Sequence, residues 1–74
     1  MMTQAVSRSI VEEIGETAGV VWKALADNGP LTVAKLLKKV EQPRDTVMQA
    51  LGWLAREDKI TITDERRNRV VALR

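Results

Sequence analysis

The sequence of 74 residues contains no cysteine and no histidine, and tyrosine and phenylalanine are absent as well. Without cysteine a disulfide framework is excluded, and without cysteine and histidine the usual nitrogen and sulfur ligands of zinc and iron are missing. Catalytic nucleophiles and bases are equally scarce, since the only serines are Ser7 and Ser9 near the N-terminus. We therefore expect no structural metal, no cofactor and no enzymatic activity.

Long apolar runs are also lacking. No stretch approaches the roughly 18 apolar residues that span a bilayer, and residues 1–9 do not have the apolar core of a signal peptide. We expect a cytoplasmic chain in which residues 1–74 form one small domain and residues 1–8 are frayed or disordered. A core of this size supplies only a few kcal/mol of net stability, so self-association would add burial.

Acidic and basic residues are unevenly distributed along the chain. Residues 1–28 hold two basic against four acidic side chains, whereas residues 29–74 hold ten basic against six acidic ones. The formal charge of +2 therefore divides into −2 for the first part and +4 for the second. This asymmetry favours a C-terminal part that faces an anion such as nucleic acid.

The first expected helix begins at a capping box. In Ser9-Ile10-Val11-Glu12 the serine hydroxyl can accept from the Glu12 amide while the Glu12 carboxylate accepts from the Ser9 amide. The sequence Asn28-Gly29-Pro30 then ends the helix. The apolar residues that recur between these signals at helical spacing are Ile10, Ile14, Ala18, Val21, Trp22 and Leu25. This pattern predicts an amphipathic helix.

Gly15 and Gly19 lie on one flank of this helix, together with Ala26 and next to Trp22. Each glycine lowers helix stability by about 1 kcal/mol relative to alanine, so two on one side indicate the close approach of another backbone or ring. Two interpretations are open. Either Trp22 and a neighbouring helix of the same molecule fill this flank, or the flank is the seam of a dimer.

A second helix is expected in VAKLLKKVE (33–41), with Thr32 as its N-cap. Its inner side consists of Val33, Leu36, Leu37 and Val40. Three lysines lie outside or at its edge, namely Lys35, Lys38 and Lys39. They either face solvent or contact phosphates, as the helix that crosses a nucleic-acid backbone does. The break at Gln42-Pro43 leaves only a few residues before the next helix, which is the spacing of a helix-turn-helix.

The third expected helix covers residues 43–58. Its apolar face consists of Val47, Leu51, Leu54 and Ala55. The opposite face carries Asp45, Gln49, Gly52, Trp53 and Arg56. A purely solvated helix would carry mostly lysine and glutamate, so we expect this face to contact a partner. Gln49 and Arg56 are residue types that can read base edges in a major groove, and Arg44 adds a basic side chain at the start of the helix.

Two short β-branched runs in residues 60–73 predict a hairpin directly after the exit turn 57–59, where Asp58 is expected in a left-handed conformation. The side chains expected to point to the core are Ile60, Ile62, Val71 and Leu73. Residues 64–69, DERRNR, form the tip, with Asn68 available for a positive φ. The tip arginines, Arg66, Arg67 and Arg69, either follow a phosphate groove or are solvated like the charged hairpin tip of any soluble protein.

Trp53 favours a different kind of contact. A large indole beside Gly52 on an outward flank is more typical of a protein interface than of a major groove. Three interpretations are open: the indole packs within its own chain, contacts a second subunit or another protein, or stacks on a base of RNA or single-stranded DNA.

The strings IGETAGVVWKAL (14–25) and ALGWLAREDKI (50–60), with the helix-turn-helix between them, resemble a family of small stand-alone prokaryotic winged helix-turn-helix proteins. The resemblance implies the fold, and general winged-helix usage makes helix 43–58 the recognition helix and residues 64–69 the wing. It implies DNA binding only by analogy and assigns no catalytic or ligand residues. Asp45, Gly52 and Trp53 depart from the basic and polar set that is usual on a recognition helix.

The sequence thus predicts an α+β fold, mainly α, with three helices followed by a β-hairpin wing. We expect a winged helix-turn-helix protein that binds double-stranded DNA as a homodimer through helix 43–58 and the wing, as a transcriptional regulator does. The alternative is an interaction module without nucleic acid. This module would use the face around Trp53 and Gly52. The candidate interface residues of a dimer or of such a module are Gly15, Gly19, Trp22, Gly52 and Trp53.

Overall fold

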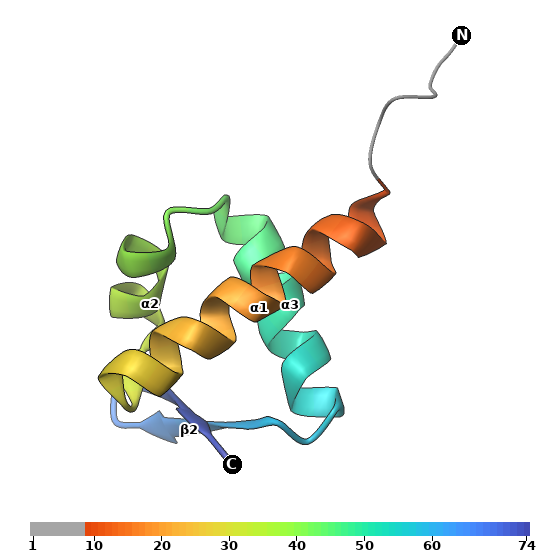
Figure 1. Cartoon of the computed structure of the whole chain (residues 1–74). Helices are drawn as coiled ribbons and strands as arrows, with labels where there is room; N and C mark the ends of the chain where they lie inside the picture. Colours follow the sequence, from red (N-terminus) through yellow and green to blue (C-terminus); the bar gives the residue numbers. More distant parts are fainter. Residues whose placement is uncertain (1–8) are drawn as a thin grey trace, which may run out of the picture.

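The structure is a computed structural model that describes residues 9–74, and these residues form three helices and a three-stranded sheet (Figure 1). The elements in chain order are α1 (Ile10–Asn28), β1 (Leu31–Thr32), α2 (Val33–Val40), α3 (Arg44–Arg56), β2 (Ile60–Glu65) and β3 (Asn68–Leu73). This order confirms the predicted α+β winged helix-turn-helix fold. The expectation for residues 1–8 lies outside the described part of the chain.

Both ends of α1 form as their signals predict. The Ser9 hydroxyl accepts from the Glu12 amide at 3.0 Å, and the Glu12 carboxylate accepts from the Ser9 amide at 3.1 Å. At the other end Gly29 adopts a φ of 78°, and its amide donates to the Leu25 carbonyl at 2.8 Å. The two bonds of the capping box and the glycine C-cap satisfy backbone groups that a helix leaves open at its ends.

The buried stripe of α1 is narrower than the sequence pattern indicates. Its buried residues are Thr17, Ala18, Val21 and Leu25, whereas Ile10 and Trp22 are exposed. Trp22 follows Val21 directly, and a step of roughly 100° turns its indole away from the core. The expectation of an inward Ile10 and Trp22 was therefore wrong, and the surface gains two large apolar side chains.

Helix α2 begins where the Thr32 hydroxyl accepts from the Lys35 amide at 3.2 Å. Leu36 and Val40 are buried, and Val33 and Leu37 pack at the edge of the core. The helix ends at Glu41, whose φ of 51° is left-handed, a conformation that the sequence did not reveal.

Helix α3 is shorter than the predicted 43–58, since it covers Arg44–Arg56 with Pro43 as its N-cap. Its inner face consists of Val47, Ala50, Leu51 and Leu54. Ala55 was expected on this face but is exposed, because Ala50 lies nearer to the direction of the other three residues. Helix α1 crosses α3 and covers it, as Figure 1 shows.

The sheet has the order β1-β3-β2, with both pairs antiparallel. Leu31 pairs with Val71, and Ile60 pairs with Leu73. The central strand is therefore the last one in the chain, and it joins the short segment before α2 to the hairpin. The sequence did not predict the pairing of Leu31, because two residues are too few to show an alternating pattern.

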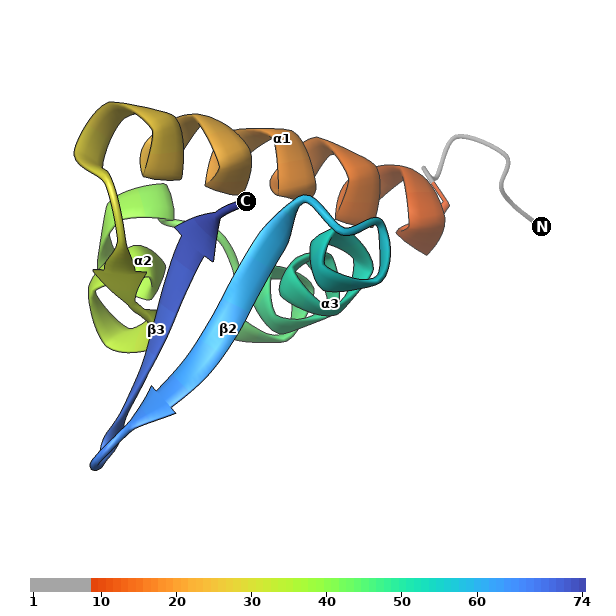
Figure 2. The same cartoon turned by 90° about the horizontal axis from the view of Figure 1, so that it is seen from below.

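The wing projects beyond the helices (Figure 2). Its turn consists of Arg66 and Arg67 alone, so the predicted tip of 64–69 was too long. The positive φ falls on Arg66, at 59°, and not on Asn68, while Asp58 adopts the expected left-handed conformation with a φ of 65°. Ile62 was expected in the core but is 39% exposed although its partner Val71 on β3 is fully buried, because β2 is an edge strand of the sheet.

The core lies between the three helices and the inner face of the sheet. Its largest fully buried side chains are Leu25, Leu36, Leu51, Val21, Val47 and Val71, which come from all three helices and from β3. No helix within residues 9–74 combines the length and the apolar character that crossing a membrane requires.

Candidate nucleic-acid interface

A groove of about 570 Å³ lies between α2, the start of α3 and the wing, and we call it the basic groove. Its charged side chains are Lys38, Arg44, Arg67 and Arg69. Apolar side chains complete the lining, namely Val33, Ala34, Leu37 and Met48, together with Thr32 and Asn68. Four of the predicted nucleic-acid contacts, from three separate elements, thus meet in one place.

The local structure explains why these four cations converge. Lys38 lies on the outer side of α2, opposite the buried Leu36 and Val40. Arg44 is the first residue of α3, directly after the turn of the helix-turn-helix. Strand β3 pairs with β1, and β1 is followed directly by α2. This pairing places the wing, with Arg67 and Arg69, next to α2.

The arginines of the wing differ in their partners. Arg69 lies opposite Asp64 in the hairpin, and its Nε donates to the Asp64 carboxylate at 3.1 Å. Within residues 9–74, Arg66 and Arg67 form no ion pair, and both are exposed. Asp64 therefore offsets part of the charge of Arg69, while Arg66 and Arg67 keep their guanidinium groups available to a ligand.

The structure does not bring the remaining predicted contacts into this groove. Lys35 and Lys39 are exposed on the other flank of α2. Gln49 lies on the α1 side of α3, in a hollow that it shares with Val11, Ile14 and Trp53. Arg56 is exposed at the last turn of α3 and lines neither space.

Sequence reasoning missed Met48 and Asn68 as lining residues. Met48 follows Arg44 by four positions and so lies on the same side of α3, a spacing that could have revealed it. Asn68 had been assigned to the turn, and its place in the groove depends on the short tip and on the register of β3.

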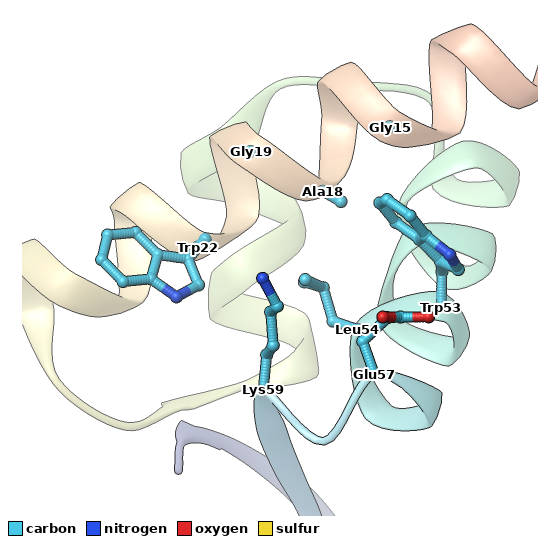
Figure 3. A pocket seen from close by; sticks show the side chains of 8 residues that line it. All are labelled: Gly15, Ala18, Gly19, Trp22, Trp53, Leu54, Glu57 and Lys59. Carbon is cyan, nitrogen blue, oxygen red and sulfur yellow. The ribbon is translucent and has the colours of Figure 1, made fainter.

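A second groove lies between α1 and the C-terminal half of α3, and we call it the tryptophan groove. Its volume is about 290 Å³, and it is lined by Gly15, Ala18, Gly19, Trp22, Trp53, Leu54, Glu57 and Lys59. The two indoles, each 46% exposed, stand at opposite ends of it, as Figure 3 shows. The two grooves have no lining residue in common.

The glycines of α1 face open space in this groove. A Cβ atom added at Gly15 or Gly19 would meet nothing within 4 Å beyond its own helical neighbourhood, and the same holds for Gly52 on the outer face of α3. Within residues 9–74, no neighbouring helix fills the flank of Gly15 and Gly19. Gly52 does not line the tryptophan groove, although Trp53 does.

Comparison with known proteins agrees with this geometry. Residues 7–73 match the model of a family described as winged helix-turn-helix domain (DUF2582). The chain is also 36% identical over 64 residues to the uncharacterized protein MJ1608 of Methanocaldococcus jannaschii, an alignment that covers 84% of this chain and 91% of the archaeal one. The arrangement of α2, α3 and the wing, the family match and the archaeal relative lead to one conclusion: the chain belongs to the winged helix-turn-helix domain family DUF2582.

Proposed function

We propose that this protein binds double-stranded DNA as a homodimer and acts as a transcriptional regulator. The observation that carries the proposal is the basic groove, in which four cations from α2, α3 and the wing surround one open space. Duplex DNA is a dense anion, and basic side chains that neutralise its phosphates supply much of a protein's affinity for it.

The two parts of the surface suit different tasks. Lys38, Arg44 and the wing arginines would contact phosphates and hold the protein in register. The outer face of α3 would present Arg56 to base edges in the major groove, whereas Gln49 lies on the α1 side of the helix, away from the basic groove. Asp45 and Gly52 share this outer face, so base readout would rest on few side chains.

The experiment is a titration of a labelled random-sequence duplex at salt concentrations between about 50 and 200 mM, read by fluorescence anisotropy. Each phosphate contact adds about −0.9 to the slope of log affinity against log salt. Replacing Lys38 and Arg67, two cations that line the basic groove, by alanine should therefore flatten this slope by up to about 2, with the fold unchanged by circular dichroism.

A matched control removes the same charge from the other side of α2. The double variant Lys35→Ala, Lys39→Ala also loses two cations, but both lie outside the basic groove. Its slope should stay close to that of the wild type. If both double variants lose slope equally, binding follows net charge and the basic groove is not the contact surface. If the wild type does not raise the anisotropy of the labelled duplex even at low salt, the protein does not bind DNA.

A second candidate function has its own observation. Trp53 is 46% exposed and lines a groove that nothing in residues 9–74 fills, which is typical of a protein-interaction surface. An interaction module without nucleic acid would retain no duplex in the same titration, yet would form complexes that depend on Trp53.

A further inference from the structure

We propose, as a refinement of the homodimer in the proposed function, that two copies of this chain join through their tryptophan grooves. The copies are related by a two-fold axis, and their α1 helices lie antiparallel across each other. Four properties of the surface support this arrangement: its apolar area, its open floor, its charges and its length.

The surface is apolar over more than the groove alone. Six large apolar side chains are exposed in residues 9–74, and three of them line this groove or the hollow beside it: Val11, Trp22 and Trp53. Val11, which is 76% exposed, shares a second hollow with Trp53, so the apolar surface continues past the indole toward the start of α1. Contiguous apolar surface of this kind marks an interaction site.

The floor of the groove makes the surface complementary to itself. Two half-exposed indoles, Trp22 and Trp53, project from the groove (Figure 3). Gly15 and Gly19 lie between them and form a notch that no other part of residues 9–74 fills. A two-fold contact requires one surface to carry both the projections and the spaces that receive them. The same contact would offset the stability that α1 loses by having glycine and not alanine at positions 15 and 19.

Charges at the two ends select the antiparallel orientation. The Glu57 carboxylate lies beside Trp53, whereas the Lys59 side chain rises toward α1 between the two indoles, on the Trp22 side of Leu54 (Figure 3). On α1, Glu12 and Glu13 precede the glycines, whereas Lys23 after them is paired with Asp27 at 3.6 Å, so Lys59 supplies the basic end. An antiparallel pair brings the acidic end of each copy to the basic end of the other, while a parallel pair would bring like charges together.

The length of α1 is sufficient for this contact. From Val11 to Trp22 the helix rises by roughly 17 Å at 1.5 Å per residue, so one α1 can cover the groove of the other. The basic groove lies on α2, α3 and the wing and shares no lining residue with this surface. A dimer built in this way leaves both basic grooves open to DNA.

Sedimentation equilibrium of the full chain without DNA tests the contact. The wild type should reach twice the monomer mass of 8.3 kDa at micromolar concentrations. Gly19→Gln fills the notch and should raise the dimer dissociation constant at least about tenfold, because truncating or blocking a central contact typically costs this much. Gly52→Gln makes the same exchange at an open helical position outside the groove, and it should leave the dissociation constant unchanged.

Charge exchange then distinguishes a second copy from a different protein. Glu57→Lys alone and Lys59→Glu alone should each weaken the dimer, and the double variant should restore it, because both copies change sign together. A wild type that stays monomeric at high micromolar concentration overturns the dimer itself. A dimer that Gly19→Gln does not weaken uses another surface, and a double variant no tighter than the single ones overturns the antiparallel arrangement. None of these outcomes affects the DNA titration, so the failure of either proposal can be recognised separately.

Discussion

At the scale of single residues, three non-glycine residues within the described range 9–74 adopt a backbone conformation that favours glycine. Glu41, Asp58 and Arg66 have φ values of 51°, 65° and 59°. Only Asp58 was foreseen, because a helix exit before a strand demands a sharp turn. The other two have no sequence signature, since neither glutamate nor arginine is typical of a left-handed position.

Glu41 allows a direct test of this strain. A left-handed conformation costs an ordinary residue roughly 1–2 kcal/mol, and glycine avoids most of that cost while losing some entropy on folding. Glu41→Gly should therefore raise the free energy of unfolding by about 0.5–1 kcal/mol, measured by urea denaturation at a fixed protein concentration.

The matched control is Glu57→Gly, which removes the same side chain from the helix cap of α3. Glu57 has a φ of −79°, so glycine relieves no strain there and should lower stability by up to about 1 kcal/mol. Equal effects at the two positions would show that the loss of the carboxylate, and not the backbone conformation, determines the outcome.

At the scale of elements, the limits of the sequence prediction have a common physical cause. The signals that begin and end helices depend only on neighbouring residues, and those predicted from the sequence are confirmed: the capping box, Asn28-Gly29-Pro30 and the N-cap Thr32. Whether a lysine of α2 lines the basic groove depends on the position of the wing. The spacing of residues along one helix carries no information about that position. Lys38 lines that groove and Lys35 does not, although both are exposed lysines of α2.

The hairpin shows the same limit within one strand. Ile60 and Ile62 lie on one face of β2, yet they are 3% and 39% exposed, because β2 is an edge strand and only its start is covered on this face. Ile60→Ala should cost about 2–5 kcal/mol of stability as a buried large-to-small change. Ile62→Ala should cost less than about 1 kcal/mol.

Thermal and chemical denaturation of the two variants measure this difference. The comparison is internally controlled, because residue type, strand and face are the same. Similar losses at the two positions would mean that the wing is packed against the helices along its whole length, contrary to its course in Figure 2.

At the scale of the whole molecule, formal charge distinguishes α1 from the elements that line the basic groove. Residues 1–28, which contain α1, have a formal charge of −2, while residues 29–74 have +4. DNA would therefore be attracted to the side of α2 and the wing, and α1 would be left to a partner of another kind. The sequence already contained this asymmetry, but the presence of two separate grooves required the fold.

The tryptophans provide a spectroscopic readout of assembly. Both indoles are half exposed in the single chain and would lose water if two grooves met. Emission should shift to shorter wavelength as the protein concentration rises, and Gly19→Gln should remove the shift. In Trp53→Phe, the remaining signal comes from Trp22 alone.

A concentration-independent emission maximum in the wild type, with the dimer present by sedimentation, would place both indoles outside the contact. The shift in Trp53→Phe should be smaller than that of the wild type but not absent, because Trp22 stands at the other end of the groove.

The position of β3 in the sheet has a consequence for biosynthesis. Leu31 of β1 pairs with Val71 of β3, and β2 pairs with the same strand. Neither edge strand can therefore be paired before residues 68–73 have been synthesised. While the ribosome is still synthesising this segment, the apolar faces of α1, α2 and α3 can pack only against one another. A nascent chain would therefore possess its helices before it possesses a wing, and any ligand that needs the wing could be bound only after synthesis has passed β3.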